Sequence, residues 1–580
     1  MFQRKNIIAF IIALITISCA TVVPPNGGPI DTTAPYPVGM KPDNYSRNFN
    51  EKKAVIKFDE FVILDKLTQQ MVVSPEMLEK PEVLIRGKKV IISIPDSLSE
   101  NTTYTIFFGN AIVNYKENLP ISNFEYVFST GDEVDSLMLE GTAVKAFDHK
   151  PAENSFVMLY KEYDDSIPYK KRPYYLTKVE ANGHFRMNNL SAGKYKIFAL
   201  QDMNSNYLFD QPIEEIAFID SLVVPHPNPL SYKSAPRDST DTIPSEQVDI
   251  PVFEPLHLRL FTENIKEQGI LSSKLLKPNK FQIAFAMPVT SLELKPLNLK
   301  KDTVWHFDKI SKEQDTLVSW LLGVRQDTLI MEVSDQGHVL DTLRFILHKR
   351  KRTLDTRPKK NKKRGETEKP KPKRIPKIAY STNANGGFPF YSDIHFEFKT
   401  PIRKWDPTKI KILRQRDTIV DTLDTKPYFI DSVYRMHLVI PTKFEEYKKY
   451  GVFISDSVFF DIYGHTHDTI SKMFVTTEMR EYGSMSLTLT YPEETPLLIQ
   501  LLDGKDKVVF QNSILKSKKI SYPYLKPGSY RIKAIADANN NGKWDTGDYL
   551  MNIQPEKVFF TDQPIVIRAN WDVDQEWIIE

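Results

Sequence analysis

An oxygen-rich segment near the C-terminal end of the chain has the residue types and spacing of a cation-binding loop. Oxygen ligands are available at loop positions 1, 3, 5, 7, 9 and 12, the seventh through its backbone carbonyl: Asp537, Asn539, Asn541, Lys543, Asp545 and Asp548. Calcium accepts six to eight such oxygens in a loose geometry, and Gly542 stands at the sixth position, where the loop must turn sharply. The sequence therefore predicts a calcium loop. The alternative is an Asx-rich hairpin whose side chains cap their own backbone.

Two departures from the common calcium loop define the expected site further. Position 12 is Asp548 rather than a longer, bidentate Glu, and only three of the ligands are anionic, which predicts modest affinity. The flanking residues have the alternating pattern of strands, so the loop is not expected to be a helical EF-hand. Trp544, inside the loop, could present an aromatic face to a sugar.

A weaker copy of the same segment lies 335 positions earlier. It keeps Asp202, Asn204, Asn206 and Asp210 in phase but has Tyr207 in place of the glycine and Ile213 at position 12, followed by Glu214. The preceding Leu-x-x-Gly-x-Tyr pattern recurs at the same offset, which indicates an internal duplication. We expect this copy to be a weaker or lost cation site.

Other chemistry-bearing patterns are few. The pair His465 and His467 offers two imidazoles with no third ligand evident, and we expect it to lie in a solvated turn. The chain contains no Gly-x-Ser-x-Gly, no His-Glu-x-x-His and no phosphate-binding Gly-rich Lys loop. Neighbouring carboxylates such as Asp59 and Glu60 alternate between the two faces of a strand, which does not suit a shared acid–base site. The sequence therefore favours a non-enzymatic protein.

The elements that carry these residues are expected to be strands throughout. At 580 residues and 41% hydrophobic composition the chain can form several globular domains, and a net charge of +3 gives no reason to expect a nucleic-acid partner. Short alternating runs separated by turn-forming residues predict an all-β chain of sandwiches.

The N-terminal segment has the pattern of an export signal. Arg4 and Lys5 precede a short apolar run that ends at Ser18, and Cys19 is the only cysteine. This arrangement resembles a bacterial lipobox, although Thr16 stands where Leu is usual. The resemblance implies a signal peptide over 1–18, an N-terminal lipid on Cys19 and a tether over 19–33; the alternative is an ordinary signal peptide with a chance cysteine.

The region 34–132 resembles the bacterial Ig-like domain named from surface-layer proteins. The resemblance rests on Phe58-Asp59-Glu60, on Asn101-Thr-Thr-Tyr104-Thr-Ile106 and on Phe124-Glu-Tyr-Val-Phe128-Ser-Thr-Gly131. It implies a β-sandwich but indicates little about function, because such sandwiches serve many roles.

The duplicated segments resemble prealbumin-like, or carboxypeptidase regulatory-like, β-sandwiches, which are non-catalytic modules. They occupy 136–222 and 482–580, and a second Ig-like domain is expected at 378–479, closing with Phe474-Val-Thr476-Thr477. A divergent β domain is expected at 251–348, where the Phe281 strand is similar to the Phe58 strand. Pro- and Ser-rich residues make 223–250 a linker.

A strongly basic segment separates the divergent β domain from the second Ig-like domain. Residues 349–377 hold 15 Lys and Arg against 3 acidic residues, so the rest of the chain carries a net negative charge. Four prolines and few apolar residues cannot support a core. We expect a solvated linker, with anionic lipid or polysaccharide as the alternative partner.

Taken together, the chain resembles Ig-like-domain lipoproteins of Gram-negative envelopes. The resemblance implies a lipid-anchored outer-membrane protein that acts as a scaffold or accessory subunit of an envelope complex, such as a barrel-assembly or transport complex. A calcium-assisted glycan-binding or adhesion protein is the alternative. Whether the domains face the periplasm or the medium stays open.

Overall fold

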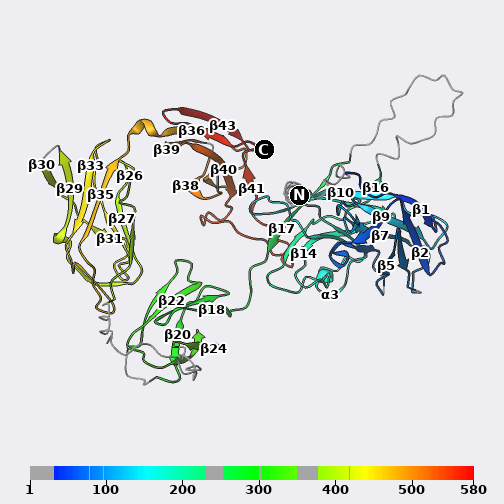
Figure 1. The fold of residues 1–580 in the computed structure, drawn as a ribbon, viewed down its shortest axis with the longest axis horizontal. Helices are drawn as coiled ribbons and strands as arrows, with labels where there is room; N and C mark the ends of the chain where they lie inside the picture. Colours follow the sequence, from blue (N-terminus) through cyan, green and yellow to red (C-terminus); the bar gives the residue numbers. More distant parts are fainter. Residues whose placement is uncertain are drawn as a thin grey trace, which may run out of the picture. The chain divides into compact units, whose positions relative to one another are not determined.

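A computed structural model confirms that the chain is all-β and built from several domains (Figure 1). It describes residues 32–77, 79–95, 97–228, 253–299, 304–348, 376–416, 419–516 and 518–579. The described helices are single turns, such as α2 (Leu67–Gln70) and α3 (Ile167–Lys170). The chain divides into two compact units, Met1–Thr262 with Asp548–Ile553, and Glu263–Gly547 with Gln554–Glu580.

The first module of the first unit is an Ig-like sandwich. Its strands are β1 (Pro37–Lys41), β2 (Lys53–Phe58), β3 (Val62–Leu64), β4 (Val72–Ser74), β5 (Glu82–Arg86), β6 (Lys89–Ser93), β7 (Thr103–Gly109), β8 (Ile112–Asn114) and β9 (Phe124–Ser129). One sheet has the order β1-β2-β6-β5 and the facing sheet β4-β7-β9, with β3 and β8 paired separately. The core between the sheets includes Phe58, Ile106 and Phe128, all fully buried.

The second module of the first unit is a β-sandwich, in the region where a prealbumin-like sandwich was expected. Its strands are β10 (Leu137–Lys145), β11 (Phe156–Tyr160), β12 (Tyr175–Lys178), β13 (His184–Leu190), β14 (Lys196–Gln201), β15 (Glu215–Phe218), β16 (His226–Pro227) and β17 (Leu256–Thr262). They follow the order β12-β11-β14-β15-β17-β10-β13, and β16 also pairs with β10.

Strand β17 belongs to this sandwich, which changes the expected boundary at residue 251. It pairs parallel with β10 and antiparallel with β15, and its Leu258 and Leu260 are buried in the module's core. The segment 223–250, expected as an interdomain linker, therefore joins two strands of one module. The physical reason is that β17 fills the place beside β10 and satisfies backbone groups that an open edge would expose.

The second unit begins with the divergent β domain. Its strands are β18 (Ile270–Lys277), β19 (Lys280–Phe285), β20 (Leu292–Pro296), β21 (His306–Ile310), β22 (Thr316–Leu321), β23 (Thr328–Asp335) and β24 (His338–Ile346). The sheets β18-β19-β22-β21 and β20-β23-β24 repeat the two main sheets of the first Ig-like module. The β19 strand takes the place of β2, and its last residue, the buried Phe285, takes the position of Phe58.

The next module repeats the Ig-like sandwich more fully. Its strands are β25 (Tyr380–Thr382), β26 (Gly387–Phe388), β27 (Ile394–Phe398), β28 (Ile402–Trp405), β29 (Ile410–Arg416), β30 (Ile419–Leu423), β31 (Tyr428–Phe429), β32 (His437–Ile440), β33 (Lys449–Ile454), β34 (Phe459–Asp461) and β35 (Ile470–Thr476), with short 3-10 turns η2 (Pro407–Lys409) and η3 (Met479–Glu481). The orders are β25-β27-β32-β31 and β26-β35-β33-β29-β30, and β28–β34 pairs as β3–β8 does.

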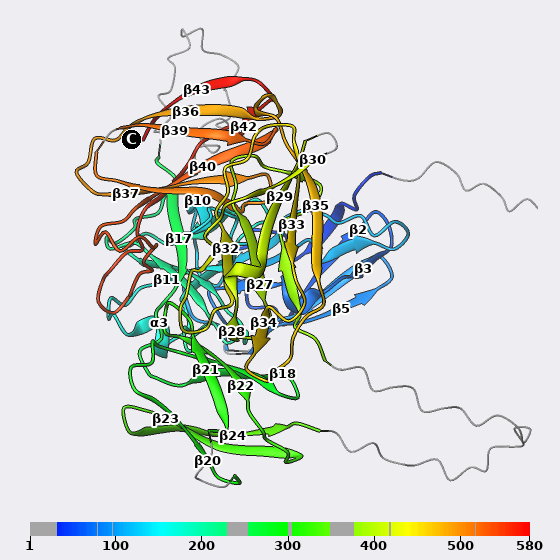
Figure 2. The ribbon, with the colours of Figure 1, turned by 90° about the vertical axis from the view of Figure 1, so that its left-hand side faces the viewer.

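The last module repeats the second module of the first unit. Its strands are β36 (Gly483–Thr490), β37 (Leu497–Asp503), β38 (Val508–Ile514), β39 (Lys518–Leu525), β40 (Gly528–Ala536), β41 (Val558–Phe560), β42 (Ile565–Ile567) and β43 (Asp572–Ile578). One sheet has the order β39-β36-β43, as Figure 2 shows; the other is β38-β37-β40-β41, with β42 on β40. The parallel β36–β43 pair is the counterpart of β10–β17, which supports the duplication.

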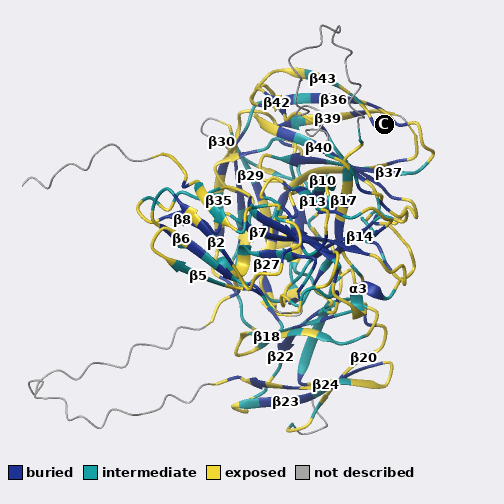
Figure 3. Cartoon of the chain, turned by 90° about the vertical axis from the view of Figure 1, so that its right-hand side faces the viewer, coloured by how far each residue is buried: buried dark blue, intermediate teal, exposed yellow. Residues whose placement is uncertain are grey.

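Each module has its own hydrophobic core because its strands alternate with period two. In β36, Met485, Leu487 and Leu489 are buried while the residues between them are at least partly exposed, and Figure 3 shows this alternation along the strand. Successive side chains of a strand point to opposite faces, so one face packs inward and the other meets solvent. The loops that connect these strands carry the candidate site residues.

Candidate cation-binding loops

The C-terminal loop follows β40 directly and is organised by Asp537. The Asp537 carboxylate is almost fully buried and accepts the backbone N–H groups of Asn541 at 2.9 Å and Gly542 at 2.8 Å, one on each oxygen. The side-chain oxygen of Asn539 also accepts the Asn541 N–H, and that of Asn541 accepts the N–H of Lys543. The loop therefore curls around a carboxylate, with Gly542 at a positive φ of 75° where the turn requires it.

The side-chain amides of this loop converge on Asp545. Asn539 and Asn541 both donate to one carboxylate oxygen of Asp545, at 2.5 and 2.8 Å. In this arrangement the amide N–H groups, rather than the amide oxygens, face Asp545. These hydrogen bonds are of the kind that a self-capped Asx-rich hairpin makes, and the oxygen-rich side chains of the predicted calcium loop lie within the same short loop.

The first copy has nearly the same network. Asp202 accepts the N–H groups of Asn204, Ser205 and Tyr207, while Asn204 and Asn206 each donate to Asp210, at 3.1 and 2.7 Å. The missing glycine does not prevent the fold, because Tyr207 itself takes a positive φ of 61°. The duplication therefore preserved the loop's architecture and not only its sequence.

Each loop is closed by its own glutamate, and neither glutamate was among the predicted site residues. Glu214, fully buried, accepts the N–H groups of Met203, Asp210 and Gln211, and Glu556 accepts those of Ala538 and Asp545. Each glutamate contacts loop positions 2 and 9. Burial, together with the charges of Asp545 and Asp537, raises the pKa of Glu556 above its ordinary value, although its backbone hydrogen bonds act in the opposite direction.

Asp548, the ligand expected at position 12, has other partners. Its carboxylate accepts the N–H of Met551 at 3.0 Å, and its backbone pairs with that of Ile553. Glu556 follows Asp545 by eleven residues, whereas Glu214 follows Asp210 by only four. Because the spacing is longer in the second copy, the sequence conceals that Glu556 and Glu214 are equivalent. Glu214, which directly follows Ile213 at position 12 of the first copy, is the signal that could have revealed the closing glutamate.

Trp544 is fixed within the module. Its indole N–H donates to the backbone oxygen of Glu556 at 2.9 Å, and its half-buried ring packs against a small core of Leu498, Ile535 and Val558. These contacts anchor the loop to β40 and β41. A ring held in this way does not present both faces to a sugar.

The His465–His467 segment differs from the expected solvated turn. His467 is 4% exposed, its Nε2 accepts the N–H of Phe459 at 3.1 Å, and burial lowers its pKa. His465 lies beside the buried carboxylate of Asp461, which also accepts the N–H groups of Tyr463 and His465. Both histidines therefore stabilise the turn after β34.

Asp461 and Asn114 have the same role in the two Ig-like modules. Asn114, fully buried at the end of β8, accepts the N–H groups of Glu117 and Leu119. The first Ig-like module has Asn114 where the second has Asp461, and the structure shows that the amide oxygen closes the turn there.

Several predictions about the N-terminal and basic segments lie outside the described residues. These are the signal peptide, Cys19 with its lipid, most of the tether and nearly all of the basic linker 349–377. Among the residues that the structure describes, no helix is long and apolar enough to span a membrane. Over the same residues, no three His, Cys, Asp or Glu side chains are grouped to hold a metal ion.

Comparison with known families identifies the first module. Residues 31–130 match the family described as the bacterial Ig-like domain, which agrees with the expected Ig-like domain at 34–132. A search of curated proteins found no significant match.

Several solved structures match long stretches of the chain at low identity. The S-layer protein rSbsC is 9% identical, with 92% of this chain and 67% of that chain covered and a TM-score of 0.14. Alpha-2-macroglobulin from Escherichia coli, spanning domains MG0-NIE-MG1, is 9% identical, with 51% and 97% covered and a TM-score of 0.17. The major pilin subunit of Bacillus cereus is 10% identical, with 77% and 99% covered and a TM-score of 0.14. At such scores, no conclusion about function follows from the likeness.

Proposed function

We propose that this chain is a lipid-anchored outer-membrane protein that acts as a scaffold or accessory subunit of an envelope complex. The observation that supports the proposal most is the series of five β modules, each with its own hydrophobic core. Such modules offer loops and sheet edges for protein contacts while their cores hold them rigid. The lipobox-like Cys19 would attach the series to the membrane.

The proposal is tested by purifying its partners. The tagged full chain is crosslinked mildly in the native envelope and purified, and the companion proteins are identified by mass spectrometry. A stoichiometric outer-membrane barrel or transport protein is the expected result. The matched control is the Cys19→Ser chain, which keeps every folded module but should lose membrane-dependent partners. Recovery of lipid without any stoichiometric protein would contradict the proposal.

The second candidate function is a calcium-assisted glycan-binding or adhesion protein. It is favoured by one observation, the two loops that gather Asp and Asn side chains in the same order around Asp537 and Asp202. The side-chain N–H groups of Asn539 and Asn541 point towards Asp545. For calcium to bind beside Asp545, both carboxamides would have to rotate so that their oxygens point there instead. Carbohydrate contact through Trp544 is disfavoured by its structural contacts.

Calcium binding is measured by comparing thermal unfolding of the full chain in calcium and in a chelator. A ligand that binds the native state raises the melting temperature by an amount that depends on its concentration relative to Kd. The variant Asp545→Asn should lose the shift of the C-terminal loop, while Asp210→Asn tests the first loop. If the melting temperature is the same in calcium and in chelator, neither loop binds calcium, both loops are polar hairpins, and the calcium-assisted function is contradicted.

A further inference from the structure

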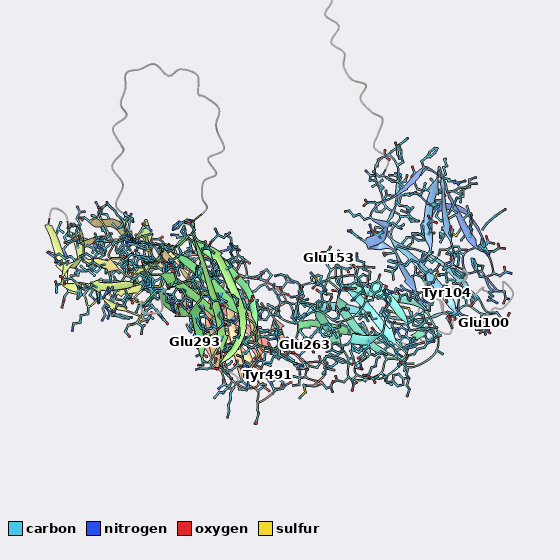
Figure 4. All side chains as sticks on the ribbon, turned by 90° about the horizontal axis from the view of Figure 1, so that it is seen from below. Glu100, Tyr104, Glu153, Glu263, Glu293 and Tyr491 are labelled. Atoms are coloured by element: carbon cyan, nitrogen blue, oxygen red, sulfur yellow. The ribbon has the colours of Figure 1, made fainter. Side chains whose placement is uncertain are left out.

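A polar groove lies between the two modules of the first unit. Its volume is about 690 Å³, within the range of roughly 300–1,000 Å³ that small-molecule sites occupy. One wall is the outer face of the β4-β7-β9 sheet, and the other is formed by β12, β13 and the loop between them. Glu153, labelled in Figure 4, also lines the groove from the segment that precedes β11.

Strand pairing explains which side chains face the groove. Thr105 and Phe107 lie on the face of β7 opposite to the core residues Ile106 and Phe108, and Glu125 of β9 lies directly across from Phe107. A half-buried aromatic ring and a carboxylate are thereby placed side by side on the outer face of the sheet. The core of the module makes no use of them.

The two walls are held together by buried hydrogen bonds. The hydroxyl of Ser74 accepts the backbone N–H of Leu176 at 3.1 Å, and the Asn189 amide donates to the Thr105 hydroxyl at 3.0 Å. Buried hydrogen bonds of this kind are costly to break, so they stabilise the contact between the two modules. The groove lies directly beside this stabilised contact.

The chemistry of the lining selects a class of ligand. Three carboxylates face two cationic side chains, so the groove has no large excess of either charge. Six lining side chains are carboxamides: Gln70, Asn110, Asn123, Asn154, Asn182 and Asn188. Gln70, Asn123, Asn182 and Asn188 each use part of their amide in hydrogen bonds within the protein. A carboxamide carries two N–H donors and a carbonyl acceptor, so the groups that remain match hydroxyl groups that both donate and accept. Phe107 adds an apolar surface.

We propose that this groove binds a neutral, hydroxyl-rich ligand of the size of a short oligosaccharide. The groove proposal depends neither on calcium binding by the two loops nor on the envelope complex. It can therefore fail while those proposals hold, and they can fail while it holds. It also agrees with two half-buried charges in the groove: burial raises the pKa of Glu125, and burial lowers the pKa of Lys178. Perturbed groups of this kind are typical of functional clefts.

The test uses the full chain and three neutral probes, maltotriose, cellotriose and triacetylchitotriose. Saturation-transfer NMR detects binding, and calorimetry measures the affinity of any probe that binds. Two variants change the groove: Phe107→Ala removes the aromatic surface, and Ser122→Trp fills the space from an exposed position at which no hydrogen bond is lost. The control Phe61→Ala removes an exposed ring of the same module outside the groove.

The expected result is binding of at least one probe, weakened about tenfold or more by each groove variant and unchanged by the control. If Phe107→Ala disturbs the fold, as judged by circular dichroism, Ser122→Trp alone decides. The proposal is overturned if none of the three probes binds at millimolar concentration, or if the groove variants bind as well as the unmodified chain.

Discussion

Glu214 is one of the two carboxylates that organise the first Asx-rich loop, together with Asp202. It is fully buried and accepts three backbone N–H groups, those of Met203, Asp210 and Gln211. Replacing it by alanine leaves these donors without an acceptor inside the protein, and hydrogen bonds to a charged group contribute about 1.5–3 kcal/mol each, without being additive. We therefore expect Glu214→Ala to destabilise the loop by about 3 kcal/mol or more.

Hydrogen exchange of the peptide that covers 202–214 measures this effect locally. The neighbouring variant Glu215→Ala is the control, because it removes a partly exposed ion pair with Lys145 that contributes less than about 1 kcal/mol. Exchange that is equally fast in both variants would show that the Glu214 hydrogen bonds do not hold the loop.

His467 makes the second Ig-like module sensitive to acid. Burial holds its pKa below the unfolded value of about 6.5, while the N–H of Phe459 donates to its neutral Nε2. Below that pH the unfolded chain binds a proton that the folded chain excludes, so stability is complete above about pH 6.5 and is lost as the pH falls towards the folded pKa. His395, whose pKa is also lowered, contributes in the same direction.

Comparison with His467→Gln isolates this contribution, because glutamine can accept the same N–H and does not titrate. Calorimetric unfolding of both chains between about pH 7.5 and pH 5.5 should show a smaller acid-induced loss in the variant. A parallel decline of the two chains would assign the loss to other groups.

At the scale of elements, Gly141 allows the parallel strand β17 to join β10. A Cβ atom at Gly141 would lie 2.1 Å from the backbone oxygen of Leu256, which is closer than any real contact. Gly141→Ala should therefore displace the start of β17 and destabilise the first sandwich by about 1–3 kcal/mol, the usual range for overpacking. In Gly39→Ala, also in a strand, the new Cβ would meet no atom within 4 Å. Thermal unfolding of the two variants checks this; similar melting temperatures would mean that β17 does not approach β10 so closely.

The strands can be predicted from alternation, but their partners cannot. Alternating residues locate β2, β7 and β9, and the repeated loop is enough to locate the two sandwiches from the sequence alone. The sequence assigns strand β17 to the wrong module because a Pro-rich segment precedes it, and only long-range pairing with β10 shows where it belongs. Glu556 escapes sequence reasoning for a similar reason, since a longer loop separates it from Asp545. The groove depends on contacts between modules, which no local pattern reports.

For the whole molecule, the proposed function requires attachment at one end of the module series. The lipobox-like Cys19 is the only cysteine, and hydrocarbon chains contribute about 0.8 kcal/mol per buried methylene, so several acyl chains would hold the protein firmly at a membrane.

We expect Cys19→Ser to move the chain from the membrane fraction to the soluble fraction while its β modules stay folded. Fractionation followed by circular dichroism measures both. If the variant stays with the membrane at low salt but is released by a high-salt wash, its attachment depends on exposed charges such as those of the basic segment 349–377, because binding to anionic lipid through such charges weakens with salt, whereas a lipid anchor does not. If the variant stays with the membrane even after the high-salt wash, attachment depends on neither this lipid nor exposed charge.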